Sequence, residues 1–585
     1  MSTAPRPPQP SPAEKPGDSA VAQNRGEVAE RPTPPELETG YYARNFERVL
    51  DTVTTRYGDL LTDEEAAYAE AFGSLSERSK RLYVRLILRR GPCFRRDLLS
   101  YEEIDDLARA ARELRAAGFL DLGEEAPLAD GLAVLRRPEL IELVVSLGEL
   151  PAAAARRLKR GELLELLLRA ERQEEVRRRL WAEYDIWRPL HAELLLLFRL
   201  LFFGNLGQDF SQFVISDLGI VRYESYPLSR EHRLFQDRTE IDQAFELRLI
   251  RQQVYGLLEE RKLEDALALA KAVSEQADTL RPVARRQADG ILIRVARELE
   301  RQGEHRQAVE LYTQARRPPA RERRCRALEQ LGELEEALSL CREMAASPLD
   351  ETESGFVPLF EHRMKKKLGL TQKPWKRSRR PTLDMEIERP QGSIEMAILE
   401  ALAEQGRRGI FSENWLWRSL FGLAFWDVVF EPVPGVFHHP FQTGPWDLSR
   451  PEFRIRRQAR IEHRLSRLRE EPDLRPRLWP VYQAKVGIAN ALVPWHPEFE
   501  TPLNFALERV SGPTLAVFCD RLSSHLRRYR RGLPDLLVES DESPVGFELL
   551  EVKGPGDQLR PEQGAWIDFL NRHDIPTRIL KVRWL

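Results

Sequence analysis

The 585-residue chain has only four cysteines, and they lie far apart without a C-x-x-C pair. This spacing excludes a disulfide scaffold and a cysteine-rich zinc site, and it fits a reducing compartment. Long apolar runs are also lacking. The most apolar stretch, 194–203, is about half the ~20 residues that a membrane-spanning helix needs, and Arg199 interrupts it. We therefore expect no membrane partner.

Neither sign of charge dominates, because 90 Lys and Arg residues face 93 Asp and Glu residues and leave a net charge of −3. A uniformly basic coat for nucleic acid is excluded, so any binding of phosphates depends on local patches. The N-terminus has no apolar segment typical of a secretory signal, which predicts a cytoplasmic location. The chain lacks both a phosphate-binding G-x-x-x-x-G-K-[ST] loop and a G-x-S-x-G nucleophile motif, which argues against ATP-driven remodelling and that type of serine hydrolase.

The length corresponds to three or four domains of about 150 residues, and 42% apolar residues suffice for several cores. The patterns predict an α+β multidomain protein. The expected parts are a disordered tail over 1–40, a helical winged-helix-like domain over 41–136, a SAP-like module over 137–190, a helical repeat domain over 191–362, a basic linker over 363–390 and an α/β domain over 391–585.

The N-terminal modules carry local basic patches. The segment 139–171 has two short amphipathic helices around Gly148 and Pro151 and is similar to the SAP module, which grips the backbone of duplex DNA. The alternative is a helical hairpin that only packs. The candidate DNA contacts in this module are Arg156, Arg157, Lys159 and Arg160.

Three internal near-repeats, at 257–271, 299–313 and 328–342, place matching alanines at Ala266, Ala308 and Ala337. They resemble tetratricopeptide repeats and predict an α-solenoid, although their spacing straddles the usual ~34 residues. Such a solenoid binds protein partners or braces other domains. The basic linker that follows is either a solvated connection or an arm that tracks a nucleic-acid backbone, and we favour the arm.

The C-terminal segment predicts the order β-β-α-β, with strands near 536–538, 547–553 and 575–584 and a helix that begins near Pro561. Glu551 and Lys553 share one face of the second strand with apolar neighbours, which is costly unless the charges have partners. Asp535, just before the first strand, supplies a second carboxylate at the same end. Two converging carboxylates favour a hard divalent cation such as Mg²⁺ or Mn²⁺.

Pro534-Asp535 followed by Glu551-Val552-Lys553 is the arrangement of the PD-(D/E)xK nucleases, and the strand-loop-strand context strengthens this interpretation. The alternative is a purely structural salt bridge between Glu551 and Lys553. RGLPDLL, ELLEVKGPGDQL and EQGAWIDFL resemble the VRR-NUC domain. SKRLYVRLILRR, YPLSREHRLFQDR and the segment 393–430 resemble the rest of the Fanconi-associated nuclease family, in the same order, so the resemblance covers most of the chain after residue 41.

The resemblance implies which residues form the site. The family's helical glutamate falls on Glu395, with Glu400 as a rival. The catalytic set is then Glu395, Asp535, Glu551 and Lys553, with metal held by the three carboxylates and the Val552 carbonyl. The residues of second rank are Gln563 and Asp557, which would hold the scissile phosphate or the attacking water, and Arg238 at the end of the YPLSREHRLFQDR stretch.

Four arginines directly before Asp535 point to phosphate binding at the same site: Arg527, Arg528, Arg530 and Arg531. One departure from the animal members is Glu562, where they carry a lysine, so a pocket for a terminal 5′ phosphate would be weaker or differently built. His438 and His439 have no third ligand at a useful spacing and are predicted to be structural. Asp427 is predicted to form hydrogen bonds rather than to bind metal.

The resemblance implies a structure-specific, Mg²⁺- or Mn²⁺-dependent DNA nuclease. It would cut 5′ flaps as an endonuclease, digest from 5′ ends as an exonuclease and act in DNA repair, including interstrand-crosslink repair. The expected partner is branched or flapped duplex DNA, and the expected state is a bacterial, cytoplasmic monomer that associates with the nucleoid when it acts on DNA. The alternatives are a catalytically silent scaffold on branched DNA and an RNA-directed or restriction-type nuclease.

Overall fold

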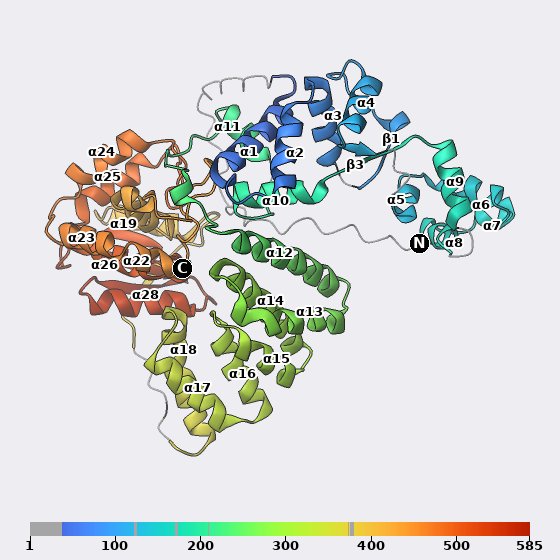
Figure 1. The fold of residues 1–585 in the computed structure, drawn as a ribbon. Coiled ribbons are helices and arrows are strands. Elements are labelled where there is room, and N and C mark those ends of the chain that lie inside the picture. The colour runs from blue at the N-terminus through green and yellow to red at the C-terminus, as the bar shows by residue number, and fades with distance from the viewer. Residues whose placement is uncertain are drawn as a thin grey trace. The chain divides into compact units, whose positions relative to one another are not determined.

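The computed structural model describes residues 38–89, 91–121, 126–169, 173–208, 210–371, 374 and 379–585. Nearly all of the expected N-terminal tail and part of the basic linker lie outside these residues. The chain forms two compact units (Figure 1). The N-terminal unit comprises residues 35–344 with 432–445, and the C-terminal unit comprises 345–431 with 446–585.

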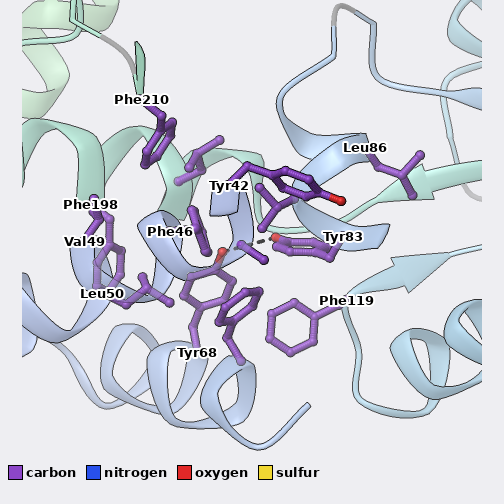
Figure 2. Packing of buried hydrophobic residues seen from close by; sticks show 14 of the residues in the cluster. Tyr42, Phe46, Val49, Leu50, Tyr68, Tyr83, Leu86, Phe119, Phe198 and Phe210 are labelled. Atoms are coloured by element: carbon purple, nitrogen blue, oxygen red, sulfur yellow. Dashed lines mark hydrogen bonds between the residues drawn. The ribbon is translucent and has the colours of Figure 1, made fainter. Parts of the chain in front are cut away.

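An aromatic core holds the first part of the N-terminal unit together. Figure 2 shows Phe46, Tyr68, Tyr83, Phe119 and Phe198 packed against one another, and the hydroxyls of Tyr68 and Tyr83 lie 3.2 Å apart. Burial of such rings is the main source of stability here. The helices around this core are α1 (Tyr41–Tyr57), α2 (Asp63–Gly73), α3 (Glu77–Ile87), α4 (Leu107–Ala116), α10 (Ala192–Phe203) and α11 (Ser211–Asp217).

A small antiparallel sheet completes this winged-helix-like part, in the order β1-β3-β2. Its strands are β1 (Phe94–Arg95), β2 (Leu120–Asp121) and β3 (Ile186–Pro189). The central strand β3 follows the SAP-like helices in the sequence but pairs with β1 and β2, which precede them. The SAP-like segment is therefore an insertion into the winged-helix-like fold and does not follow it. Because β1 and β2 have only two residues each, they show no detectable alternation of apolar and polar side chains. The sequence therefore predicted a simple domain boundary at residue 136.

The SAP-like segment has its own apolar core. Its helices are α5 (Leu128–Ala133), α6 (Arg137–Ser146), α7 (Ala152–Ala155), α8 (Arg160–Leu167) and α9 (Gln173–Glu183). Where the sequence predicted two helices flanking Gly148 and Pro151, the structure has three, because α7 is a separate turn. The basic cluster 156–160 links α7 to α8 and begins the latter, and Arg156, Arg157, Lys159 and Arg160 are all exposed.

Three helix pairs form the predicted solenoid (Figure 1). They are α12 (Arg238–Glu259) with α13 (Leu263–Gln276), α14 (Pro282–Arg301) with α15 (His305–Gln314), and α16 (Ala320–Leu331) with α17 (Leu334–Ala346). Ala266, Ala308 and Ala337 are fully buried, as their place in the repeats predicted. The pairs begin at Arg238 and not near residue 191, because the apolar side chains of α10 belong to the aromatic core instead. Short 3₁₀ turns occupy Arg96–Leu98, Arg230–His232 and Ala277–Thr279.

Replacing Ala308 with leucine should destabilise the N-terminal unit by about 1–3 kcal/mol, because three added carbons must enter a closely packed helix contact. The same change at Ala272, which is exposed on α13, should have little effect. Chemical unfolding of both variants checks this. Equal stabilities of the two variants would contradict close packing at the repeat alanine.

The C-terminal unit is built on a mixed five-stranded sheet in the order β4-β8-β7-β6-β5. The strands are β4 (Thr382–Ile387), β5 (Gly409–Phe411), β6 (Leu536–Glu539), β7 (Phe547–Lys553) and β8 (Thr577–Trp584). β8 runs parallel to β4 and β7, whereas β6 is antiparallel to both β7 and β5. The predicted β-β-α-β order is therefore confirmed as the centre of a larger sheet, with α28 (Pro561–Arg572) between β7 and β8.

Helices pack around this sheet, and Trp417 of α20, Phe518 of α26 and Trp566 of α28 stack on one another in the core. Besides α28, the helices of this unit are α18 (Glu351–Lys367), α19 (Ile394–Glu404), α20 (Trp415–Ala424), α21 (Trp426–Val429), α22 (Glu452–Arg456), α23 (Gln458–Arg469), α24 (Arg475–Lys485), α25 (Glu500–Arg509), α26 (Gly512–Ser524) and α27 (Leu526–Tyr529). Among the described residues, no helix is both long and apolar enough to cross a bilayer.

The expected basic linker over 363–390 includes parts of a helix and a strand. Its first residues end α18, and its last residues form β4, the edge strand beside β8. The alternation of Leu383, Met385 and Ile387 is the only signal for this strand, and its other positions are exposed. The surrounding prolines and charges concealed that signal in the sequence.

Candidate active site

The antiparallel register of β6 and β7 brings Asp535 and Glu551 together. Leu536 pairs with Leu550, so Asp535, one residue before the paired segment, lies opposite Glu551 on the same face of the sheet. The carboxylate Oδ2 of Asp535 accepts a hydrogen bond of 2.8 Å from the backbone N–H of Val552. This bond joins the side chain of Asp535, just before the start of β6, to the backbone of β7 and so fixes the aspartate side chain.

The segment before Asp535 is fixed to α28. The indole N–H of Trp566 lies 3.1 Å from the carbonyl oxygens of both Tyr529 and Arg531. Gly532, with a φ of 79°, passes so close to the first turn of α28 that a Cβ there would lie 2.7 Å from the carbonyl carbon of Glu562. Only glycine fits this close approach at positive φ, which explains the glycine of the G-L-P-D motif.

The two carboxylates are buried, Glu551 completely and Asp535 to all but 6%. Burial raises the pKa of Asp535, and the neighbouring charge of Glu551 raises it further. Burial also raises the pKa of Glu551, although Lys553 opposes that shift. The pair therefore holds more negative charge than its apolar surroundings favour.

Lys553 compensates only part of this charge. Its Nζ lies 2.6 Å from Oε1 of Glu551, so the salt bridge that we considered as an alternative does exist. The other carboxylate oxygen, Oε2 of Glu551, is buried without a hydrogen-bond partner. A buried, unsatisfied carboxylate oxygen beside a second buried carboxylate is the chemistry that a hard divalent cation requires, so these residues fit a metal ion.

Glu413 is a member of this site that the sequence analysis missed. It follows β5, and Ser412 before it donates a backbone hydrogen bond of 2.7 Å to the carbonyl of Asp535. Its charge raises the pKa of both Asp535 and Glu551. Burial raises the pKa of Glu413 itself, and the charge of Glu395 adds to this shift. The detectable signal was an acidic residue two positions after the short apolar run Gly409–Phe411.

Glu395 lies in the first turn of α19, where the Ser393 hydroxyl donates a hydrogen bond to its carboxylate. It is half-buried, and its charge raises the pKa of Glu413. Glu400, its rival, is exposed. Within the described ranges, no three Asp, Glu, His or Cys side chains are close enough to hold a metal ion. The expected set of Glu395, Asp535 and Glu551 is therefore not assembled in this structure.

The residues of second rank have structural hydrogen bonds. Oε1 of Gln563 accepts the backbone N–H of Arg560 at 2.9 Å and so caps α28, and Oδ2 of Asp557 accepts the N–H of Gly554 at 2.9 Å within the turn after β7. Arg560, which the sequence analysis also missed, lowers the pKa of Glu413 and Glu551 by its charge. It is thus a second cation at the acidic site.

The four arginines before Asp535 have different surroundings. Arg527 and Arg531 are exposed, and Arg530 is half-buried. Arg528 donates to the carbonyl of Glu351 at the start of α18, so it joins α18 to α27 rather than facing the carboxylates. Elsewhere, in the N-terminal unit, Arg238 forms ion pairs with Glu65 and Asp242 at the start of α12.

The other signals are structural, as predicted. His438 and His439 are buried in the N-terminal unit, and burial lowers the pKa of both to about 3. Nε2 of His439 lies 3.1 Å from the side-chain oxygen of Gln208. Asp427 forms ion pairs with Arg464 at 2.9 Å and with Arg460 at 3.3 Å.

The metal-free protein should lose stability as the pH rises from about 5 to about 8, because Asp535 and Glu551 have raised pKa values. Unfolded carboxyl groups titrate near pH ~4, so in this range the folded protein holds protons that the unfolded chain has released. The resulting stabilisation is complete below pH ~4 and is lost as the pH rises through the raised pKa values. Thermal unfolding in EDTA measures it.

The D535N variant isolates this effect, since it removes one of the two repelling charges. It should lose less stability than the wild type over the same pH range, and added Mg²⁺ or Mn²⁺ should restore the wild type at the upper pH. Parallel pH curves for the two proteins would contradict the raised pKa values.

Comparison with known proteins supports a nuclease. Residues 469–584 match a family model described as the VRR-NUC domain, and residues 40–121 match one described as the HTH domain of FAN1. A Fanconi-associated nuclease 1 homolog from Pseudomonas aeruginosa is 34% identical, over 94% of this chain and 96% of the relative. The human Fanconi-associated nuclease 1 is 26% identical, over 91% of this chain and 61% of its own length.

The fold is similar to the crystal structure of paFAN1 bound to 5′-flap DNA with a flap of 2 nucleotides and a gap. The TM-score is 0.77 at 33% identity, and the match covers 94% of this chain and 100% of that chain. The mixed sheet with Asp535, Glu551 and Lys553 at the ends of adjacent strands defines a nuclease domain of the PD-(D/E)xK type, a type that generally uses divalent metals. The chain belongs to the Fanconi-associated nuclease family.

Proposed function

We propose that this chain is a structure-specific DNA nuclease that hydrolyses phosphodiesters with Mg²⁺ or Mn²⁺. It cuts 5′ flaps as an endonuclease, degrades DNA from 5′ ends and acts in DNA repair, including the repair of interstrand crosslinks. The observation that carries this proposal is the buried pair of Asp535 and Glu551, with one carboxylate oxygen unsatisfied and Lys553 beside it. The flap-DNA complexes of paFAN1 support the choice of substrate.

The residues of the site have distinct roles in this mechanism. Asp535, Glu551 and the Val552 carbonyl would hold the metal, with Glu395 as the third carboxylate that the family resemblance implies. Glu413 is a second candidate for that place, because its charge raises the pKa of both Asp535 and Glu551. A bound divalent ion lowers the pKa of its water and neutralises charge that develops on the phosphate. The ammonium of Lys553 orients the attacking water or stabilises the same developing charge.

The basic residues of both units would contact the phosphates of the DNA. The exposed SAP-like cluster offers phosphate contacts on the N-terminal unit, whereas Arg527, Arg530 and Arg531 do so just before Asp535. Glu562 at the first turn of α28 lines the same pocket as Arg531, and its negative charge would weaken the binding of a terminal 5′ phosphate there. Arg528 and Arg238 contribute by holding α18 and α12 in place.

A substrate panel tests the proposal. Labelled 5′-flap, 3′-flap and nicked DNA, plain duplex and RNA are incubated with the full chain in Mg²⁺, Mn²⁺ or EDTA. We expect cleavage of the 5′-flap substrate near the branch, with either metal and not in EDTA. Binding of flap DNA without any cleavage would identify a silent scaffold instead, and equal cleavage of all duplexes would indicate a restriction-type nuclease.

A further inference from the structure

A cavity of about 800 Å³ lies at the C-terminal end of α28. It is bounded by α18, α22, α23, α26 and α27 within the same unit, and it is lined by more basic than acidic groups. Its ionisable side chains are Arg454, Arg469, Arg521, Arg572, His573, Glu351 and Asp520. The cavity is separate from the carboxylate site, because α28 extends by about 18 Å, at ~1.5 Å per residue, between Arg560 and Arg572.

Both carboxylates of this cavity already have partners. Asp520 forms an ion pair with Arg454 at 2.5 Å, and Oε2 of Glu351 accepts the hydroxyl of Tyr529 at 2.9 Å. Arg469 reaches the second oxygen of Asp520 only at 4.0 Å and is 56% exposed. A surplus of positive charge therefore remains in the cavity.

Arg521 holds part of this surplus in a fixed position. Its guanidinium lies 4.4 Å from the ring centres of Tyr529 and Trp566 and 4.0 Å from that of Phe569, and it donates to the carbonyl of Ala565 at 3.1 Å. Burial lowers its pKa to about 10, and the charges of Arg528 and then Arg572 lower it further. An anion in the cavity would relieve this repulsion between guanidinium groups.

We propose that this cavity binds a nucleotide phosphate. Guanidinium groups match the geometry of phosphate oxygens, and the volume lies within the ~300–1,000 Å³ that small-molecule sites occupy. The phosphate belongs to a DNA strand that runs along α28 from the carboxylate site. This source of the phosphate rests on the proposed function. At ~3.4 Å per nucleotide in one strand of a duplex, the length of α28 corresponds to about five nucleotides.

Equilibrium binding tests the cavity without relying on cleavage. The probe is a fluorescein-labelled oligothymidylate, the protein is the full chain carrying Asp535→Asn, and the buffer contains EDTA. Arg469→Gln with Arg572→Gln should weaken binding by about tenfold or more, because two charge-assisted contacts are lost. The slope of log affinity against log salt should fall by about 0.7 for each lost contact.

Arg583→Gln is the matched control, since Arg583 is 65% exposed on β8 of the same unit. Thymidine monophosphate is then added as a competitor of the labelled oligothymidylate. If it competes for the parent protein but not for the double variant, the cavity binds a single nucleotide. If it does not compete, the cavity binds a phosphate within a strand. Wild-type affinity and salt slope in the double variant, or an equal loss in the control, would overturn the proposal. Neither result depends on whether the chain cuts DNA.

Discussion

Replacing Asp535 with asparagine should reduce metal-dependent cleavage of a 5′-flap substrate by at least about 100-fold. Loss of a residue that only supports a metal ligand costs up to about 100-fold, and loss of a ligand itself should cost at least as much. The change removes one of two buried carboxylates that share a face of the sheet, and it keeps the size of the side chain. An amide can still accept the N–H of Val552, so the local fold should survive. Initial rates in Mg²⁺ and Mn²⁺ measure the loss.

Two controls distinguish chemistry from folding and binding. Asp541→Asn makes the same change on the exposed turn between β6 and β7 and should leave the rate unchanged. The affinity of D535N for flap DNA in EDTA should stay near that of the wild type. A D535N protein that cuts at the wild-type rate would refute the proposed function.

The central part of the site could be predicted because its signal is local. Asp535, Glu551 and Lys553 lie on two strands joined by a short turn, so the alternation of side chains and the spacing along the chain define their geometry. The same is true of the repeat alanines, whose burial follows from a period within each helix pair. Patterns of this kind survive in a single sequence.

The remaining features depend on pairing between distant segments. Glu413 reaches the site because the three-residue strand β5 pairs with β6, and neither composition nor period predicts that pairing. The strand β3 joins the winged-helix-like sheet only after the SAP-like insertion. Arg528 shows the converse error, since a run of arginines beside an acidic motif indicates phosphate binding until packing assigns one of them to α18.

Replacing Glu413 with glutamine should reduce cleavage by about 100-fold, whereas Glu395→Gln should cost closer to 10-fold. The structure gives the reason: the charge of Glu413 acts on Asp535 and Glu551, while Glu395 acts on Glu413. A residue that contacts the metal should also change its requirement for metal. Titration of activity with Mn²⁺ should therefore shift to higher concentration in E413Q, with a smaller shift in E395Q.

The pair of variants also decides between two candidates for the third carboxylate: the family resemblance implies Glu395, whereas the charge of Glu413 is the one that acts on Asp535 and Glu551. Glu400→Gln, on an exposed position of the same helix as Glu395, serves as the control and should retain the wild-type rate and metal requirement. A larger loss in E395Q than in E413Q would show that α19 moves toward Asp535 when metal and DNA bind, and it would restore the sequence-based assignment.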